Sequence, residues 1–120
     1  MIYHITTPAA WQKGQLAGRY EPEGFELEGF IHCSKQEQIV GVGERYYAGQ
    51  SGLLILGINP DKLTAKLVFE NLIGGDELFP HIYGPLNLDA AESTAAFGQN
   101  AAGGFDFPTF WTPIQLYFET

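Results

Sequence analysis

Three histidines, each with a hydroxyl nearby, are the residues of this sequence best suited to chemistry. Each histidine is followed two positions later by a hydroxyl residue: His4 by Thr6, His32 by Ser34, and His81 by Tyr83. The neighbouring residues are mostly apolar or β-branched, which favours strands, and in a strand positions i and i+2 point to the same face. A hydroxyl beside an imidazole can fix the tautomer of the ring or extend its hydrogen bonding to a ligand. The pattern predicts a pocket with three walls, each a strand carrying an imidazole and a hydroxyl.

Glu70 is the carboxylate best placed to act with these groups. It ends an alternating segment, 63–70, and there it can serve as an acid, a base or a ribose-binding carboxylate. Cys33, next to His32, points to the opposite strand face and is expected to be a small buried side chain.

Two other interpretations of the histidines stay open. Any one of them alone can be a core histidine whose nitrogens bond to the backbone. The three together, with Glu70, can also complete a zinc site, but their separations in the chain match no compact ligand motif, and no metal is predicted.

Composition indicates one small globular domain that binds a small molecule. Residues 1–120 are 45% apolar and carry a net charge of −8, from 14 acidic and 6 basic residues. Such a surface repels long nucleic acids, and the six basic residues are scattered. There is one cysteine, no signal-like N-terminus and no apolar run of about 20 residues, so the prediction is a cytoplasmic protein without membrane contact, monomeric or a weak homodimer.

The elements that must position these residues are short. Thr7 and Pro8 are typical of a helix start, with a helix over 9–16 ended near Gly18; a second helix is expected over 36–48, capped by a box of Ser34 and Glu37. Loops are expected at 19–24 and 74–77, and the segment 89–97 is ambiguous. Strands are expected over 2–6, 25–34, 53–58, 63–70, 79–86 and 110–118. The chain is too short for several crossovers, so the predicted fold class is α+β, a small, largely antiparallel sheet core with two short helices in the N-terminal half.

Three motifs together resemble one family. Residues 2–6 (IYHIT), 28–34 (EGFIHCS) and 79–85 (FPHIYGP) are similar to motifs of the bacterial family DUF952, a domain of unknown function. The resemblance covers 1–108 and leaves 109–120 as a β-prone extension. It implies a remote relation to the ADP-ribosyltransferase fold, in which split sheets bind NAD in the cleft between them.

The resemblance also implies roles for the residues. His4 is similar to the first-strand histidine that contacts the ribose of NAD in that superfamily. His32 and Ser34 resemble the second motif of the tRNA 2′-phosphotransferase branch, although the spacing there is His-x-x-Ser. That branch uses several arginines, and this chain has only Arg19 and Arg45, so removal of a tRNA 2′-phosphate is not expected.

The expected function is therefore binding of NAD or a related nucleotide, with transfer or hydrolysis of ADP-ribose. NAD enters as a substrate, His32 and Glu70 are the predicted catalytic residues, and the ligand is held by His4, Thr6, Ser34, His81 and Tyr83. A non-catalytic domain that binds a small ligand is the alternative, followed by a metal-dependent hydrolase that uses the three histidines.

Overall fold

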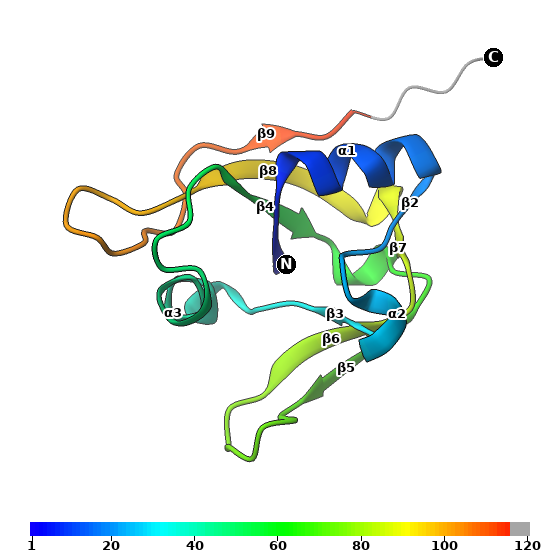
Figure 1. Cartoon of the computed structure of the whole chain (residues 1–120). Coiled ribbons are helices and arrows are strands. Elements are labelled where there is room, and N and C mark those ends of the chain that lie inside the picture. Colours follow the sequence, from blue (N-terminus) through cyan, green and yellow to red (C-terminus); the bar gives the residue numbers. More distant parts are fainter. Residues whose placement is uncertain (116–120) are drawn as a thin grey trace.

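Two antiparallel β-sheets form the framework of the protein, seen in a computed structural model that describes residues 1–115. The first sheet has the order β1 (Ile2–Thr6), β4 (Leu53–Ile58), β8 (Ala91–Phe97) and β9 (Thr112–Pro113). The second has the order β3 (Ile31–His32), β6 (Phe79–Tyr83) and β5 (Lys66–Glu70). A two-stranded ladder pairs β2 (Arg19–Tyr20) with β7 (Leu86–Asn87). Figure 1 shows β4, β8 and β9 of the first sheet in the upper part of the view and β3, β5 and β6 of the second sheet in the lower part.

Three helices lie in the N-terminal half: α1 (Pro8–Ala17), α2 (Phe25–Glu28) and α3 (Gln36–Tyr46). Two 3₁₀ turns, η1 (Pro60–Lys62) and η2 (Leu88–Ala90), precede β5 and β8. The predicted α+β class and its antiparallel sheets are confirmed, with one helix more than expected. No helix within the described residues is long and apolar enough to cross a membrane.

The start of α1 follows the predicted rule. Pro8 occupies the first helical turn, Thr7 Oγ1 accepts the Ala10 N–H at 3.1 Å, and Gly18 closes the helix with a left-handed φ of 84°. The predicted capping box of α3, which begins at Ser34, lies one residue too early. The N-cap is Lys35, whose backbone N–H donates to Gln38 Oε1 at 2.9 Å, because the backbone of Ser34 is paired with Tyr3 instead.

The strand predicted over 25–34 is wrong in its first half. Residues 25–28 form the single helical turn α2, and only Ile31–His32 are strand. Gly24 and Gly29 bracket the turn with φ of 85° and 80°, conformations that side-chain-bearing residues rarely adopt. The Phe-Glu-Leu-Glu alternation is therefore not a strand pattern here, and Leu27 lies almost fully exposed.

Three smaller differences concern the loops and the C-terminal part. The predicted loop at 19–24 contains β2, the ambiguous segment 89–97 becomes η2 and β8, and the last predicted strand is reduced to β9. Residues 116–118 of that predicted strand lie outside the described residues.

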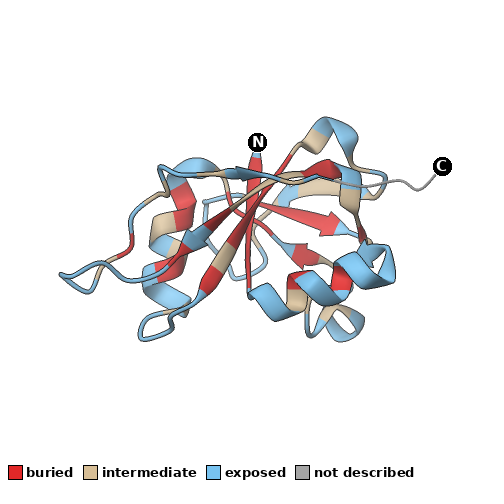
Figure 2. Cartoon of the chain, turned by 90° about the horizontal axis from the view of Figure 1, so that it is seen from above, coloured by how far each residue is buried: buried red, intermediate tan, exposed pale blue. Residues whose placement is uncertain are grey.

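The core has two parts, which Figure 2 shows as buried residues gathered along the central strands and on the inner sides of α1 and α3. One cluster joins the second sheet to α1 and β4 and includes Trp11, Tyr20, Ile31 and Ile82. The other packs α3 on the first sheet through Ile39, Ile55, Phe97 and Phe105. The sheets themselves are joined by a backbone bridge, in which Tyr3 N–H donates to Ser34 O at 2.8 Å and Ser34 N–H donates to Tyr3 O at 2.7 Å.

Candidate functional site

A cavity of about 790 Å³ lies at this junction of the sheets. Its walls come from β1, from the β3 segment that runs into Ser34, from the β5–β6 hairpin and from the C-terminal end of α3. The volume is in the range of small-molecule sites. All three histidines line it, each from a different strand, but β3 and β6 are paired, so the structure has two histidine-bearing walls and not the three predicted, and Tyr83 is not part of the lining.

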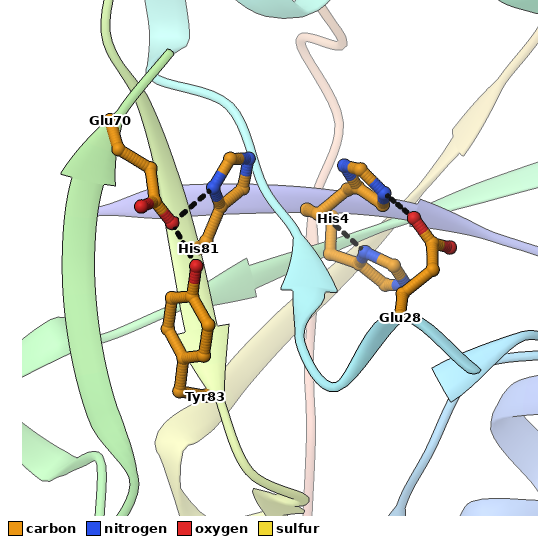
Figure 3. Close-up of polar contacts among 6 residues, drawn as sticks. His4, Glu28, Glu70, His81 and Tyr83 are labelled. Atoms are coloured by element: carbon orange, nitrogen blue, oxygen red, sulfur yellow. Dashed lines mark hydrogen bonds and ion pairs between the residues drawn. The ribbon is translucent and has the colours of Figure 1, made fainter. Parts of the chain in front are cut away.

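Glu70 and His81 form a pair on the β5–β6 hairpin. Register places Val68 opposite His81, so Glu70, two residues further along β5, is the diagonal neighbour of His81 on the same sheet face. Glu70 Oε2 accepts one hydrogen bond from His81 Nδ1 at 2.9 Å and another from the Tyr83 hydroxyl, and Figure 3 shows this one oxygen joined to both side chains.

These contacts shift the pKa values of Glu70 and Tyr83. The Tyr83 hydroxyl first, and His81 second, hold the pKa of Glu70 below its usual value, so that the carboxylate stays ionised. The same hydrogen bond raises the pKa of Tyr83, which stays protonated and donating. Both donors bind Oε2, and no described residue hydrogen bonds to Oε1.

His81 presents its other ring nitrogen to the cavity. The residue is only 5% exposed, and Nε2 has no hydrogen-bond partner among the described residues. Every fully buried side-chain nitrogen or oxygen in the described part of the chain does have a partner. Nε2 therefore reaches the cavity surface, and with Nδ1–H donated to Glu70 it is an acceptor in the neutral ring.

His32 forms a second pair with Glu28, the last residue of α2. His32 Nε2 lies 2.6 Å from Glu28 Oε2, and both side chains are more exposed than those of the first pair. His32 is the direct cross-strand partner of His81, and their ring centroids are 5.4 Å apart with the planes at 86°. Phe30 packs on both rings, 4.8 Å from His32 and 4.6 Å from His81. Two imidazoles, each oriented by a carboxylate, thus share one wall of the cavity.

His4 differs because both of its nitrogens are used within the protein. Nδ1 lies 2.6 Å from the His32 carbonyl oxygen, which can only accept, so Nδ1 carries the proton. Nε2 must then accept from the Tyr20 hydroxyl at 2.8 Å, and the same hydroxyl lies 2.8 Å from Thr6 Oγ1. Burial lowers the pKa of His4 to about 4, so the ring is neutral at neutral pH, and burial raises the pKa of Tyr20 to about 12.

Ser34 combines a fixed backbone with a free hydroxyl. It is 4% exposed and lines the cavity, and its Oγ has no hydrogen-bond partner among the described residues. Because no fully buried side-chain oxygen in that part of the chain lacks a partner, the hydroxyl faces the cavity.

The structure brings most of the predicted residues together. His32, Glu70 and His81 share one cavity wall, Tyr83 supports Glu70, and His4, Thr6 and Ser34 belong to the β1–Ser34 side of the same cavity. In no pair does the hydroxyl bond directly to its own histidine: Tyr20 links His4 to Thr6, and Glu70 links His81 to Tyr83. Cys33 is buried, as expected, although it also belongs to the cavity lining, and burial raises the pKa of its thiol.

Sequence reasoning missed Glu28 and Tyr20. Glu28 precedes His32 by four residues, a spacing that brings side chains together across a helical turn but not in the strand expected there. Tyr20 lay in a predicted loop with no signal of burial. For the metal alternative, the described residues contain no group of three or more His, Cys, Asp or Glu side chains arranged to hold a metal ion.

Comparisons with known proteins show which family the chain matches. The family described as "Protein of unknown function (DUF952)" matches residues 5–94, inside the predicted 1–108 core. No curated protein matches significantly.

Solved structures of one bacterial protein are similar over most of the chain. The crystal structure of CC0527 from Caulobacter crescentus superposes with a TM-score of 0.77 at 31% identity, covering 88% of this chain and 92% of that one. Its solution NMR structure gives a TM-score of 0.70 at 31% identity, covering 86% and 89%. Neither description states an activity, so the ADP-ribosyltransferase relation stays a prediction. By the extent of the family match and of these structural similarities, the chain belongs to the DUF952 family.

Proposed function

We propose that this protein is an enzyme that binds NAD or a related nucleotide in the cavity and transfers or hydrolyses its ADP-ribose. The observation that carries the proposal is the Glu70 carboxylate, held at the cavity by Tyr83 and His81 with one oxygen unbonded. The remote relation expected from the sequence motifs points to the same chemistry.

A carboxylate suits the breaking of an N-glycosidic bond. As the bond between ribose C1′ and the nicotinamide nitrogen breaks, its electron pair leaves with nicotinamide and positive charge develops on the ribose ring. A preorganised anion stabilises that charge. The low pKa of Glu70 keeps it anionic, and its Oε1 is available for the sugar.

The polar groups of the cavity lining match a ribose. His81 Nε2 and Ser34 Oγ belong to largely buried residues, reach the cavity surface and are free to bond to hydroxyl groups that both donate and accept. Phe30 offers an aromatic surface between the two imidazoles. His4 can contact a ligand only by giving up an existing bond, so in this proposal it contributes by holding the backbone carbonyl of His32.

The same cavity wall also provides a base for the water or hydroxyl group that attacks ribose C1′. Water gives hydrolysis, and an acceptor hydroxyl gives transfer; in both cases a new C1′–O bond forms and one proton is released. His32, oriented by Glu28 at the more exposed side of the cavity, takes that proton.

Nicotinamide release tests the proposal. The full chain, incubated with NAD, is expected to release nicotinamide, and Glu70→Gln is expected to lower the rate by about a hundredfold, while NAD binding becomes weaker but stays measurable. Chromatography measures the product, and calorimetry measures the binding.

Glu37→Gln, an exposed change of equal charge on α3, is the matched control and should leave the rate unchanged. Binding without any release of nicotinamide would identify a non-catalytic ligand-binding domain. Absence of both binding and release would overturn the proposal.

A further inference from the structure

The charges that line the cavity have one sign. Among the described residues the lining contains three glutamates, Glu23, Glu28 and Glu70, and no lysine, arginine or aspartate. Lys66 acts on Glu70 from the same strand, but it is not part of the lining.

Protonation of the imidazoles does not reverse this sign. His4 is neutral at neutral pH, so only His32 and His81 can add positive charge to the lining. With both rings neutral the lining carries three negative charges, and with both protonated it still carries one. The net charge of −8 on the whole chain adds to the repulsion of anions.

The site is nevertheless built for a polar ligand. The Ser34 hydroxyl and His81 Nε2 belong to residues that are 4% and 5% exposed, and neither atom has a partner among the described residues. Phe30 packs 4.6 Å from the ring of His81, and aromatic faces of this kind attract flat cations.

Resting on the proposed function, we infer that the cavity takes the cationic N-ribosylpyridinium end of its substrate and leaves any diphosphate outside. The substrate class is therefore N-ribosylpyridinium compounds. A ligand that places a phosphate group within the cavity binds more weakly, because the glutamates of the lining repel it. The carboxylates neutralise the pyridinium charge, while Ser34 and His81 hydrogen bond to the ribose.

Binding of two ligands to the full chain tests this inference. Nicotinamide riboside, a cation without phosphate, is expected to bind at least about tenfold more tightly than ADP-ribose, an anion without pyridinium. Lowering the salt concentration should strengthen the binding of nicotinamide riboside and weaken the binding of ADP-ribose, because the negative charge of the cavity is screened less. Calorimetry of both ligands at low and at physiological salt measures the difference.

Charge variants on one element provide the control. Glu28→Gln should weaken the binding of nicotinamide riboside and reduce the difference in affinity between the two ligands. Glu26→Gln, on the same helix but outside the lining, should leave the affinities of both ligands unchanged. Equal or tighter binding of ADP-ribose, or the opposite salt dependence, overturns the inference, as does failure of both ligands to bind.

The outcomes separate this inference from the proposed function. If NAD is cleaved but ADP-ribose binds as tightly as nicotinamide riboside, the enzyme proposal stands and the charge selectivity is wrong. If nicotinamide riboside binds selectively but no pyridinium substrate is cleaved, the selectivity stands and the enzyme proposal is wrong.

Discussion

His4 holds the candidate site together without presenting a free nitrogen to it. Its two nitrogens connect Tyr20, in β2, to the carbonyl oxygen of His32, in β3. A buried donor or acceptor that loses its partner costs about 1–3 kcal/mol, so this chain of bonds fixes both the tautomer of His4 and the backbone that presents His32. One imidazole thereby orients the strand of another.

Protonation of His4 should contribute to acid unfolding. Its pKa falls from 6.5 to about 4 on folding because burial disfavours the charged ring, so the unfolded state binds the proton first as pH falls. The stability linked to His4 is complete above about pH 6.5 and is lost towards pH 4, a difference on the order of 3 kcal/mol. Urea unfolding at several pH values measures this slope.

His4→Asn provides the comparison for that slope. Asparagine can still donate to the His32 carbonyl but does not titrate. The variant should be less stable at neutral pH by about 1–3 kcal/mol, since the buried hydrogen bond between the His4 ring and the Tyr20 hydroxyl is lost. Its stability should fall less steeply between pH 6.5 and 4 than that of the wild type. Equal slopes in the two proteins would exclude His4 as the titrating group.

At the level of elements, α3 lies unusually close to the first sheet. A Cβ built on Gly43 would lie 2.8 Å from the Phe97 ring, which is buried and packs on Phe105 at a centroid distance of 4.8 Å. The absence of a side chain at Gly43 therefore sets how closely α3 approaches β8. Gly41, two residues earlier and on the exposed side of the same helix, has nothing within 4 Å of such a Cβ.

Substitution of the two glycines by alanine should have opposite effects on the stability of the protein. Gly41→Ala should stabilise the protein by about 0.5–1 kcal/mol, because alanine is the better helix former and meets no neighbour. Gly43→Ala should destabilise it by about 1–3 kcal/mol despite the same gain in helix propensity, because the Phe97 ring must move in a packed core. Thermal unfolding of both variants decides this, and equal effects would show that α3 does not pack this closely.

At the level of the whole molecule, the two sheets meet at one backbone bridge beside the cavity. Tyr3 and Ser34 exchange both of their hydrogen bonds there, and both residues are buried. The cavity lies where the sheets diverge from this bridge, so the site depends on how the sheets are joined as much as on either sheet alone.

Hydrogen exchange tests whether the sheets unfold together. The amides of Tyr3 and Ser34 are expected to exchange only through global unfolding, with an opening free energy equal to that from urea denaturation. The Gly75 amide, which is hydrogen bonded to Asn71 Oδ1 but exposed, is the internal control and should exchange much faster. Rapid exchange of Tyr3 and Ser34 would mean that the sheets separate locally at the cavity.

Much of the framework could be predicted from local pattern. The apolar run Leu53–Ile58 is a strand, as are the last five residues, Lys66–Glu70, of the strand predicted over 63–70. Thr7 with Pro8 starts a helix. These predictions succeed because burial periodicity and capping act over a few residues. The same patterns placed each histidine on or beside a strand and selected Glu70.

The pairing of these groups could not be predicted locally. Local sequence patterns indicate three His-bearing strands, an acidic chain and one candidate carboxylate. Only the tertiary structure shows that Glu28 pairs with His32 and that His81, unlike His4, keeps a nitrogen free. It also shows that, among the described residues, glutamates are the only lining residues apart from the histidines that carry charge at neutral pH. The hydrogen bonds of His4 join segments that are distant in the chain, and contacts of this kind override local preferences that differ by only about 1 kcal/mol.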